Sequence, residues 1–201
     1  NLVCGFFAIL TIFEGINQAD SDAVAAFSYY QNATFLIFAA CLFDLFDGRI
    51  ARMRGQDGPF GREFDSLADI VCFGVSPAIL CYRMGMRGLT GVAILLFYVL
   101  SGLIRLAWFN VSEEVRQDET EEKRKYYQGL PITSMAVLLP LLAVFKPMLG
   151  KREFMLSLHA LVLLVGLLFI TNFKFRKPKN RTLAIIVGVV TLAVLRMLHI
   201  W

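Results

Sequence analysis

Long apolar segments constrain this chain more than any other feature of its sequence. Runs of about twenty residues, nearly free of charge, recur along the 201 residues and are separated by short charged connections. A run of about 18 or more apolar residues is typical of a transmembrane helix, because a helix of that length crosses the hydrocarbon core of a bilayer. A soluble helical domain would need a charged face on each helix. The sequence therefore predicts an all-α, polytopic membrane helix bundle.

The apolar runs predict a single integral membrane domain that covers residues 1–201. Seven spans are expected, at about 1–18, 33–52, 61–82, 88–110, 130–149, 153–172 and 181–201. The segment 19–32 is too polar to span, and we expect it at the membrane interface, where Tyr29 and Tyr30 suit the headgroup region. Gly74 and Pro77 should kink or loosen the third span.

Positive charge is distributed unequally between the connections. Thirteen of the twenty lysines and arginines lie in 49–62, 111–129 and 173–181, which alternating spans place on one side, and six lie on the other side. The positive-inside rule assigns the richer side to the cytoplasm. We therefore interpret the net charge of +4 as a topology signal and expect no nucleic-acid partner. The expected location is the cytoplasmic (inner) membrane, among its lipids.

Four aspartates interrupt the apolar sequence of the second and third spans. Asp44 and Asp47 are three residues apart, and Asp65 and Asp69 are four apart, so each pair lies on one face of its helix. The intervening MRGQDGPF is typical of a tight turn, which makes the two helices antiparallel neighbours. At 1.5 Å per residue, Asp44 and Asp69 lie roughly 12 Å from their helix ends. We expect all four carboxylates at similar depths, just under the cytoplasmic surface.

Four clustered carboxylates cannot all remain ionised without cations. Oxygen ligands suit Mg²⁺, Mn²⁺ or Ca²⁺, and two such ions would neutralise the aspartates and bind a substrate diphosphate. The alternative is a set of salt bridges with Arg49, Arg52 and Arg62 at the helix ends. It fits Asp44 and Asp69 poorly, because they lie two turns inside apolar sequence, where a charge indicates function.

Small residues accompany the aspartates on the same helix faces. Gly48, Ala51 and Gly61 would let the two helices approach closely. They would equally leave room for a planar base beside the metals. Their spacing alone does not separate these two interpretations.

The stretch from Asp44 to Asp69 matches the pattern D-x2-D-G-x2-A-R-x8-G-x3-D-x3-D at every fixed position. It resembles the signature of the CDP-alcohol phosphotransferases. The resemblance implies a core of six transmembrane helices with one or two extra helices, often assembled as a homodimer. It also implies roles for individual residues. All four aspartates would hold two divalent ions, Mg²⁺ or Mn²⁺, and Asp69 would also be the general base. The CDP-lipid would be bound by Gly48, Ala51, Arg52 and Gly61.

Weaker similarities concern the acceptor alcohol. The stretches NLVCGFFAIL, FGVSPAIL, LIRLAWFN and YYQGLP are similar to those of the serine-using branch of the family, the phosphatidylserine synthases. This implies CDP-diacylglycerol and serine as substrates, and phosphatidylserine and CMP as products. Branches that use glycerol-3-phosphate, inositol phosphate or choline share the aspartate motif, so they remain alternatives.

Binding of serine would call for a cation near the aspartates. Arg105, inside the fourth span, is the candidate for the serine carboxylate or the diphosphate, unless it reaches out to lipid phosphate. Further candidates are Asn110, Gln128 and Asn1, the last at the cytoplasmic end of the first span.

A divalent-cation transporter is the alternative from another functional class, because intramembrane carboxylates are common in ion pathways. A transporter would require polar groups that continue from the aspartates to the outer face of the membrane. The outer halves of spans two and three are apolar, so the predicted site is one-sided.

Overall fold

The computed structural model of the protein describes residues 1–19, 21–53, 58–119, 126–176 and 180–199. These residues form helices almost throughout. In chain order the elements are α1 (Leu2–Gln18), α2 (Ala23–Met53), α3 (Pro59–Asp69), the π-helical segment η1 (Ile70–Val75), α4 (Ser76–Met84), α5 (Gly88–Glu119), β1 (Tyr126–Gln128), α6 (Ser134–Val144), α7 (Lys151–Ile170), β2 (Lys174–Arg176) and α8 (Asn180–His199).

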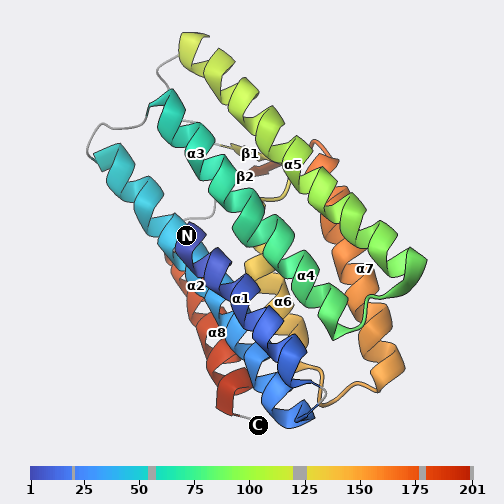
Figure 1. Cartoon of the computed structure of the whole chain (residues 1–201). Helices are drawn as coiled ribbons and strands as arrows, with labels where there is room; N and C mark the ends of the chain where they lie inside the picture. Colours follow the sequence, from blue (N-terminus) through green and yellow to red (C-terminus); the bar gives the residue numbers. More distant parts are fainter. Residues whose placement is uncertain (20, 54–57, 120–125, 177–179, 200–201) are drawn as a thin grey trace.

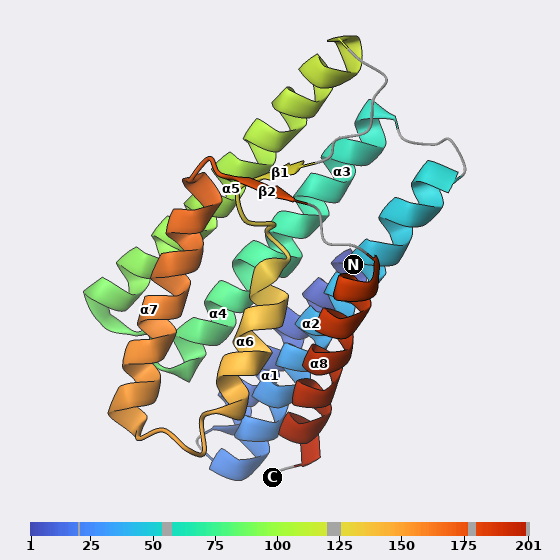
Figure 2. The same ribbon diagram turned by 180° about the vertical axis from the view of Figure 1, so that it is seen from behind.

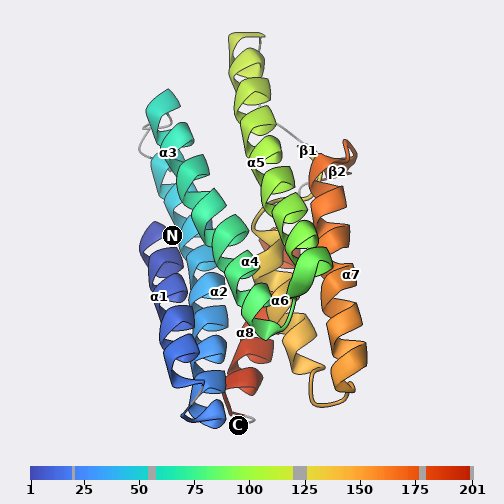
Figure 3. The same ribbon diagram turned by 45° about the vertical axis from the view of Figure 1, so that its right-hand side comes forward.

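The helices run up and down in one elongated bundle (Figures 1 and 2). One end of the bundle holds the start of α1, the end of α2, the start of α3, the end of α5 and both strands; we call it the aspartate end. The connections α1–α2, α4–α5 and α6–α7 lie at the opposite end. Figure 3 shows that α3 and α5 extend beyond the start of α1 at the aspartate end. This alternation is the one that the predicted spans require.

Within the described residues, seven apolar helices follow the order of the seven predicted spans. Four are long and apolar enough to cross a membrane, namely Ala25–Gly48, Pro59–Met84, Gly88–Arg116 and Lys151–Ile170. Three shorter apolar helices are Leu2–Gln18, Ser134–Val144 and Ile185–Arg196. The prediction of an all-α integral membrane bundle is confirmed.

The structure differs from the sequence prediction in two segments. The segment 19–32 was expected to precede the second span, but α2 begins at Ala23 and includes most of it; its location at the membrane interface stays a prediction. The hydroxyl of Tyr30 donates to the carbonyl of Gly15 at 2.9 Å, so this polar part of α2 packs against α1. The predicted span 130–149 contains a helix only from Ser134 to Val144, which is about 16 Å long.

The helix that carries Asp65 and Asp69 changes its winding directly after Asp69. Pro77 has no N–H to donate to the carbonyl of Phe73 four residues earlier, and the segment from Ile70 to Val75 is π-helical. The buried hydroxyl of Tyr98 on α5 donates to that carbonyl of Phe73. The expected loosening of the third span is therefore confirmed, and α5 supplies the missing donor.

A small antiparallel ladder at the aspartate end was not predicted. Tyr126 pairs with Arg176 and Gln128 with Lys174. Gly129 follows β1 with a φ of +71°, a conformation that glycine adopts without strain, and its N–H donates to the carbonyl of Phe173 at 2.8 Å. The ladder joins the segment before α6 to the segment after α7. It could not be predicted from the sequence, because each strand is too short to show an alternation of apolar and polar residues.

Candidate metal and substrate site

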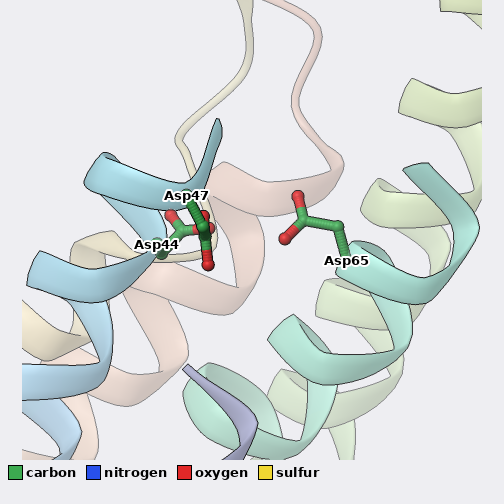
Figure 4. Close-up of side chains that lie close together, drawn as sticks. All are labelled: Asp44, Asp47 and Asp65. Carbon is green, nitrogen blue, oxygen red and sulfur yellow. The ribbon is translucent and has the colours of Figure 1, made fainter. Parts of the chain in front are cut away.

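Three carboxylates meet between α2 and α3 at the aspartate end. Asp44 and Asp47 come from α2 and Asp65 from α3, and one oxygen of each lies within 4.8 Å of the others. Figure 4 shows Asp65 facing the two α2 aspartates across the gap between the helices. Asp44 is half-buried, whereas Asp47 and Asp65 are exposed at the rim. The predicted antiparallel pairing of the two helices brings them together.

The donor set fits a hard divalent cation. Ionised carboxylates only accept hydrogen bonds, and three at this spacing repel one another unless positive charge lies between them. One oxygen of Asp47 accepts the N–H of Gly48 at 2.7 Å, which orients that carboxylate. These three aspartates could hold a metal ion, with oxygen ligands of the kind that Mg²⁺, Mn²⁺ and Ca²⁺ prefer.

Asp69 lies outside this group of three. It is one helical turn after Asp65 on α3, about 6 Å further along the helix axis, and only 8% of its surface is exposed. Its Oδ1 accepts a hydrogen bond of 2.9 Å from the side-chain amide of Asn1. Asn1 therefore contacts one of the motif aspartates, whereas its suggested role in binding serine and the role of Asp69 as a fourth metal ligand stay predictions.

A close contact between α1 and η1 places Asn1 beside Asp69. A Cβ on Gly5 would overlap the Sγ of Cys72 and lie 3.0 Å from its Cα, which is a tight contact for a Cβ atom. Ser76 donates to the carbonyl of Gly5 at 3.2 Å from the same side. Because Asn1 precedes Gly5 by one turn and Asp69 precedes Cys72 by three residues, this contact determines the Asn1–Asp69 distance.

Asn110 packs against the aspartate helix. Asn110 is buried, and its side-chain amide faces the hydroxyl of Ser66. The Ser66 oxygen lies 2.9 Å from Asn110 Nδ2, which donates to it, and 3.1 Å from Asn110 Oδ1, which accepts from it. Ser66 directly follows Asp65, so this pair holds the α3 aspartates against α5. The sequence does not predict the roles of Ser66 and Tyr98, because nothing in their spacing indicates partners 44 and 25 residues away.

Arg105 lies on another side of α5, next to the ladder. A Cβ on Gly129 would be 2.8 Å from Arg105 Nη1 and 3.0 Å from the carbonyl oxygen of Thr171, so the guanidinium lies close to the turn after β1 and the end of α7. Its suggested contact with the serine carboxylate or the diphosphate stays a prediction.

The remaining predicted residues lie around the three aspartates or outside the described side chains. Gly48 follows Asp47 on α2, and Gly61 is exposed near the start of α3. Ala51 and Arg52 belong to the last turns of α2 and Gln128 to β1, but their side chains lie outside the described part of the structure. Their suggested contacts with the CDP-lipid or with serine stay predictions.

Comparison with known proteins agrees with this geometry. Residues 2–171 match the family model described as CDP-alcohol phosphatidyltransferase. The chain belongs to this family. The match covers the elements from α1 to α7, including all four aspartates of the motif.

Several relatives share one name, CDP-diacylglycerol--serine O-phosphatidyltransferase. The protein of that name from Saccharomyces cerevisiae is 45% identical over 113 residues, which are 55% of this chain and 41% of the yeast protein. The one from Helicobacter pylori (strain ATCC 700392 / 26695) is 35% identical over 156 residues, 74% of this chain and 62% of the relative. The one from Bacillus subtilis is 30% identical over 152 residues, 74% of each chain. The chain thus matches less than two thirds of the yeast and Helicobacter proteins.

Proposed function

We propose that this protein transfers the phosphatidyl group of CDP-diacylglycerol to the hydroxyl of serine, giving phosphatidylserine and CMP. The observation that carries the proposal is the group of Asp44, Asp47 and Asp65 at one end of a membrane bundle, within the family motif. The acceptor is suggested by the name that the yeast, Helicobacter and Bacillus relatives share. Other acceptor alcohols remain the alternative.

The three grouped aspartates would hold divalent cations, with Asp69 as a further candidate ligand. Two ions, Mg²⁺ or Mn²⁺, are proposed from the family resemblance. Bound there, they would supply positive charge to the diphosphate and to the phosphate of the departing CMP. The location suits the lipid substrate, because a polar site near the end of the bundle reaches the headgroup while the acyl chains stay in the membrane.

Asp69 is the proposed general base. The serine oxygen forms a bond to the phosphorus of the phosphatidyl group as the bond from that phosphorus to the CMP oxygen breaks, and the serine hydroxyl proton moves to Asp69. Asn1 donates to Oδ1 of Asp69, so the proton would go to Oδ2. Burial of this carboxylate away from water favours such a transfer, since a partly desolvated carboxylate is a better base. No covalent enzyme intermediate is required.

Release of CMP tests the proposal. Purified protein with CDP-diacylglycerol and Mn²⁺ or Mg²⁺ is offered serine, glycerol-3-phosphate, inositol phosphate or choline in parallel. Serine should raise CMP release above the background without acceptor. Release with another acceptor but not with serine would overturn the serine assignment. Mn²⁺ influx into proteoliposomes without CDP-lipid would favour the transporter instead.

The base is tested in the same assay. Asp69→Asn should lower turnover by about 10²- to 10⁴-fold, the usual contribution of a general base. Glu14→Gln is the matched control, since it removes an exposed carboxylate from α1 and should keep turnover. If Asp69→Asn releases CMP at the rate of the control, Asp69 is not the base.

Two further features belong to this proposal. The excess of lysine and arginine in the connections of the aspartate end supports an orientation in which the site faces the cytoplasm. The family resemblance supports a homodimer. Protease accessibility of the two ends in sealed vesicles tests the orientation, and light scattering in detergent tests the dimer.

A further inference from the structure

A second polar region lies at the end of the bundle opposite the aspartates. There the structure has an open cavity of about 450 Å³, lined by residues of the first turns of α2, the end of α4 and the connection from α6 to α7. Figure 1 shows these elements together at that end. Ligand pockets typically have volumes of about 300–1,000 Å³. Its lining includes three cations and three aromatic side chains, namely Arg83, Lys146, Lys151, Phe27, Tyr30 and Phe154.

Three of these residues are cations. Among the residues that the structure describes, no carboxylate oxygen lies within 4.0 Å of the charged nitrogens of Arg83, Lys146 or Lys151. Lys151 is moreover the first residue of α7, where the positive end of the helix dipole disfavours a cation. Three cations around one cavity, with no carboxylate among them, favour an anionic ligand.

Arg83 is held in place towards the cavity. Its Nε and Nη2 donate to the hydroxyl of Tyr30 at 3.0 and 2.8 Å, and that hydroxyl donates to the carbonyl of Gly15 at 2.9 Å. A guanidinium has five N–H donors in a rigid fork. Anchoring part of this fork on a neutral hydroxyl fixes its orientation and leaves its full charge for a ligand.

Lys146 is partly removed from water. Its Nζ lies 3.7 Å from the centre of the Phe27 ring, and burial lowers the pKa of this lysine below its ordinary value. A nearby anion would offset the cost of burying the ammonium group. Phe27 and Phe154 give the same cavity apolar walls, so its lining combines cations with surface suited to a hydrocarbon chain.

We propose that this cavity binds the phosphate group of an anionic phospholipid. Arg83, Lys146 and Lys151 surround the phosphate, and the adjoining part of an acyl chain lies against Phe27 and Phe154. The site is separate from the aspartates, because the two lie at opposite ends of the bundle (Figure 1). The lipid would come from the leaflet opposite the one that supplies the substrate.

Native mass spectrometry of the purified protein tests this site. The protein in neutral detergent is titrated with phosphatidylglycerol, with phosphatidylcholine of the same acyl chains and, separately, with inorganic phosphate. One phosphatidylglycerol should bind at concentrations at least several-fold below those needed for phosphatidylcholine. Equal binding of both lipids would overturn the proposal. Binding of inorganic phosphate as tight as that of phosphatidylglycerol would show a phosphate site without a lipid and would overturn it as well.

Matched variants locate the binding. Arg83→Gln should weaken phosphatidylglycerol binding by about tenfold, the loss of one charge-assisted hydrogen bond. Arg87→Gln is the control, because Arg87 lies at the same end and also sits over a tyrosine ring, that of Tyr82, but does not line the cavity. Equal losses in the two variants would place the lipid elsewhere.

A second pair of variants tests the site at exposed positions, where a substitution does not disturb folding. Lys151 and Arg152 are adjacent, exposed residues at the start of α7, and only Lys151 is among the cavity's lining residues. Lys151→Gln should weaken phosphatidylglycerol binding several-fold more than Arg152→Gln. If both variants bind the lipid as the unmodified protein does, the proposal is wrong.

Discussion

Replacing Asp65 by asparagine should change stability in opposite directions with and without metal. One oxygen from each of Asp44, Asp47 and Asp65 lies within 4.8 Å of the others. At that separation a pair of unit charges repels by about 0.9 kcal/mol in water and about 3.5 kcal/mol at an effective dielectric constant of 20. Because Asp47 and Asp65 are exposed, the value for water is the better guide.

Asp65→Asn removes two of the three repelling pairs, or roughly 2 kcal/mol. Arg62 lies one turn before Asp65 on α3, and losing its attraction costs up to about 1 kcal/mol. The net gain in the metal-free protein is about 1 kcal/mol, which corresponds to a rise in Tm of roughly 2–4 °C for a chain of this size.

Bound metal should make the unmodified protein more stable than Asp65→Asn, the reverse of their order without metal. Mn²⁺ at about one hundred times its Kd stabilises a protein by about 2.7 kcal/mol, or roughly 5–11 °C in Tm. The unmodified protein should show this gain, and Asp65→Asn should lose most of it because one of three carboxylate ligands is gone. Thermal melts followed by circular dichroism in detergent, with chelator or with Mn²⁺, measure both effects.

Glu63→Gln is the control for these melts. Glu63 is an exposed carboxylate two residues before Asp65 on the same helix, but it is not part of the group of three. The control should melt like the unmodified protein under both conditions. A variant Asp65→Asn that is less stable in chelator, or that keeps the full gain with Mn²⁺, would refute the metal assignment.

Two further substitutions test how the site is held together. Gly5→Ala should destabilise the protein by about 1–3 kcal/mol and lower turnover, because the new Cβ overlaps the Sγ of Cys72 and presses on its Cα, which moves α1 and Asn1 away from Asp69. Gly188→Ala, with nothing within 4 Å of the added Cβ, is its control, and equal melts of the two variants would contradict the close α1–η1 contact. Asn110→Ala should cost about 1–2 kcal/mol and lower turnover, since the α3 aspartates lose their hydrogen-bonded support on α5. Thr11→Val, which removes a hydroxyl bonded to a carbonyl of its own helix, should keep turnover, and an Asn110→Ala variant with full turnover would exclude a positioning role.

The sequence by itself determined the features that depend on local patterns. Apolar runs of membrane-spanning length predicted the number and order of the seven apolar helices found in the part of the chain that the structure describes, because hydropathy acts on each segment separately. The spacings within Asp44–Asp47 and Asp65–Asp69, with a Gly/Pro turn between them, predicted that Asp65 would face the two aspartates of α2, but they also predicted Asp69 in the same group. Both are consequences of helix geometry over fewer than thirty residues.

Only the tertiary structure decided how distant segments meet. The amide of Asn1 reaches Asp69 across 68 positions, and Ser66 reaches Asn110 across 44, through contacts that no local periodicity encodes. The burial of Asp69, in contrast to the exposed Asp47 and Asp65, likewise depends on the packing of α1 against η1 through Gly5. Such contacts follow from the shapes of packed helices and not from the pattern of any one of them, so the sequence could predict the four acidic groups but not their different environments.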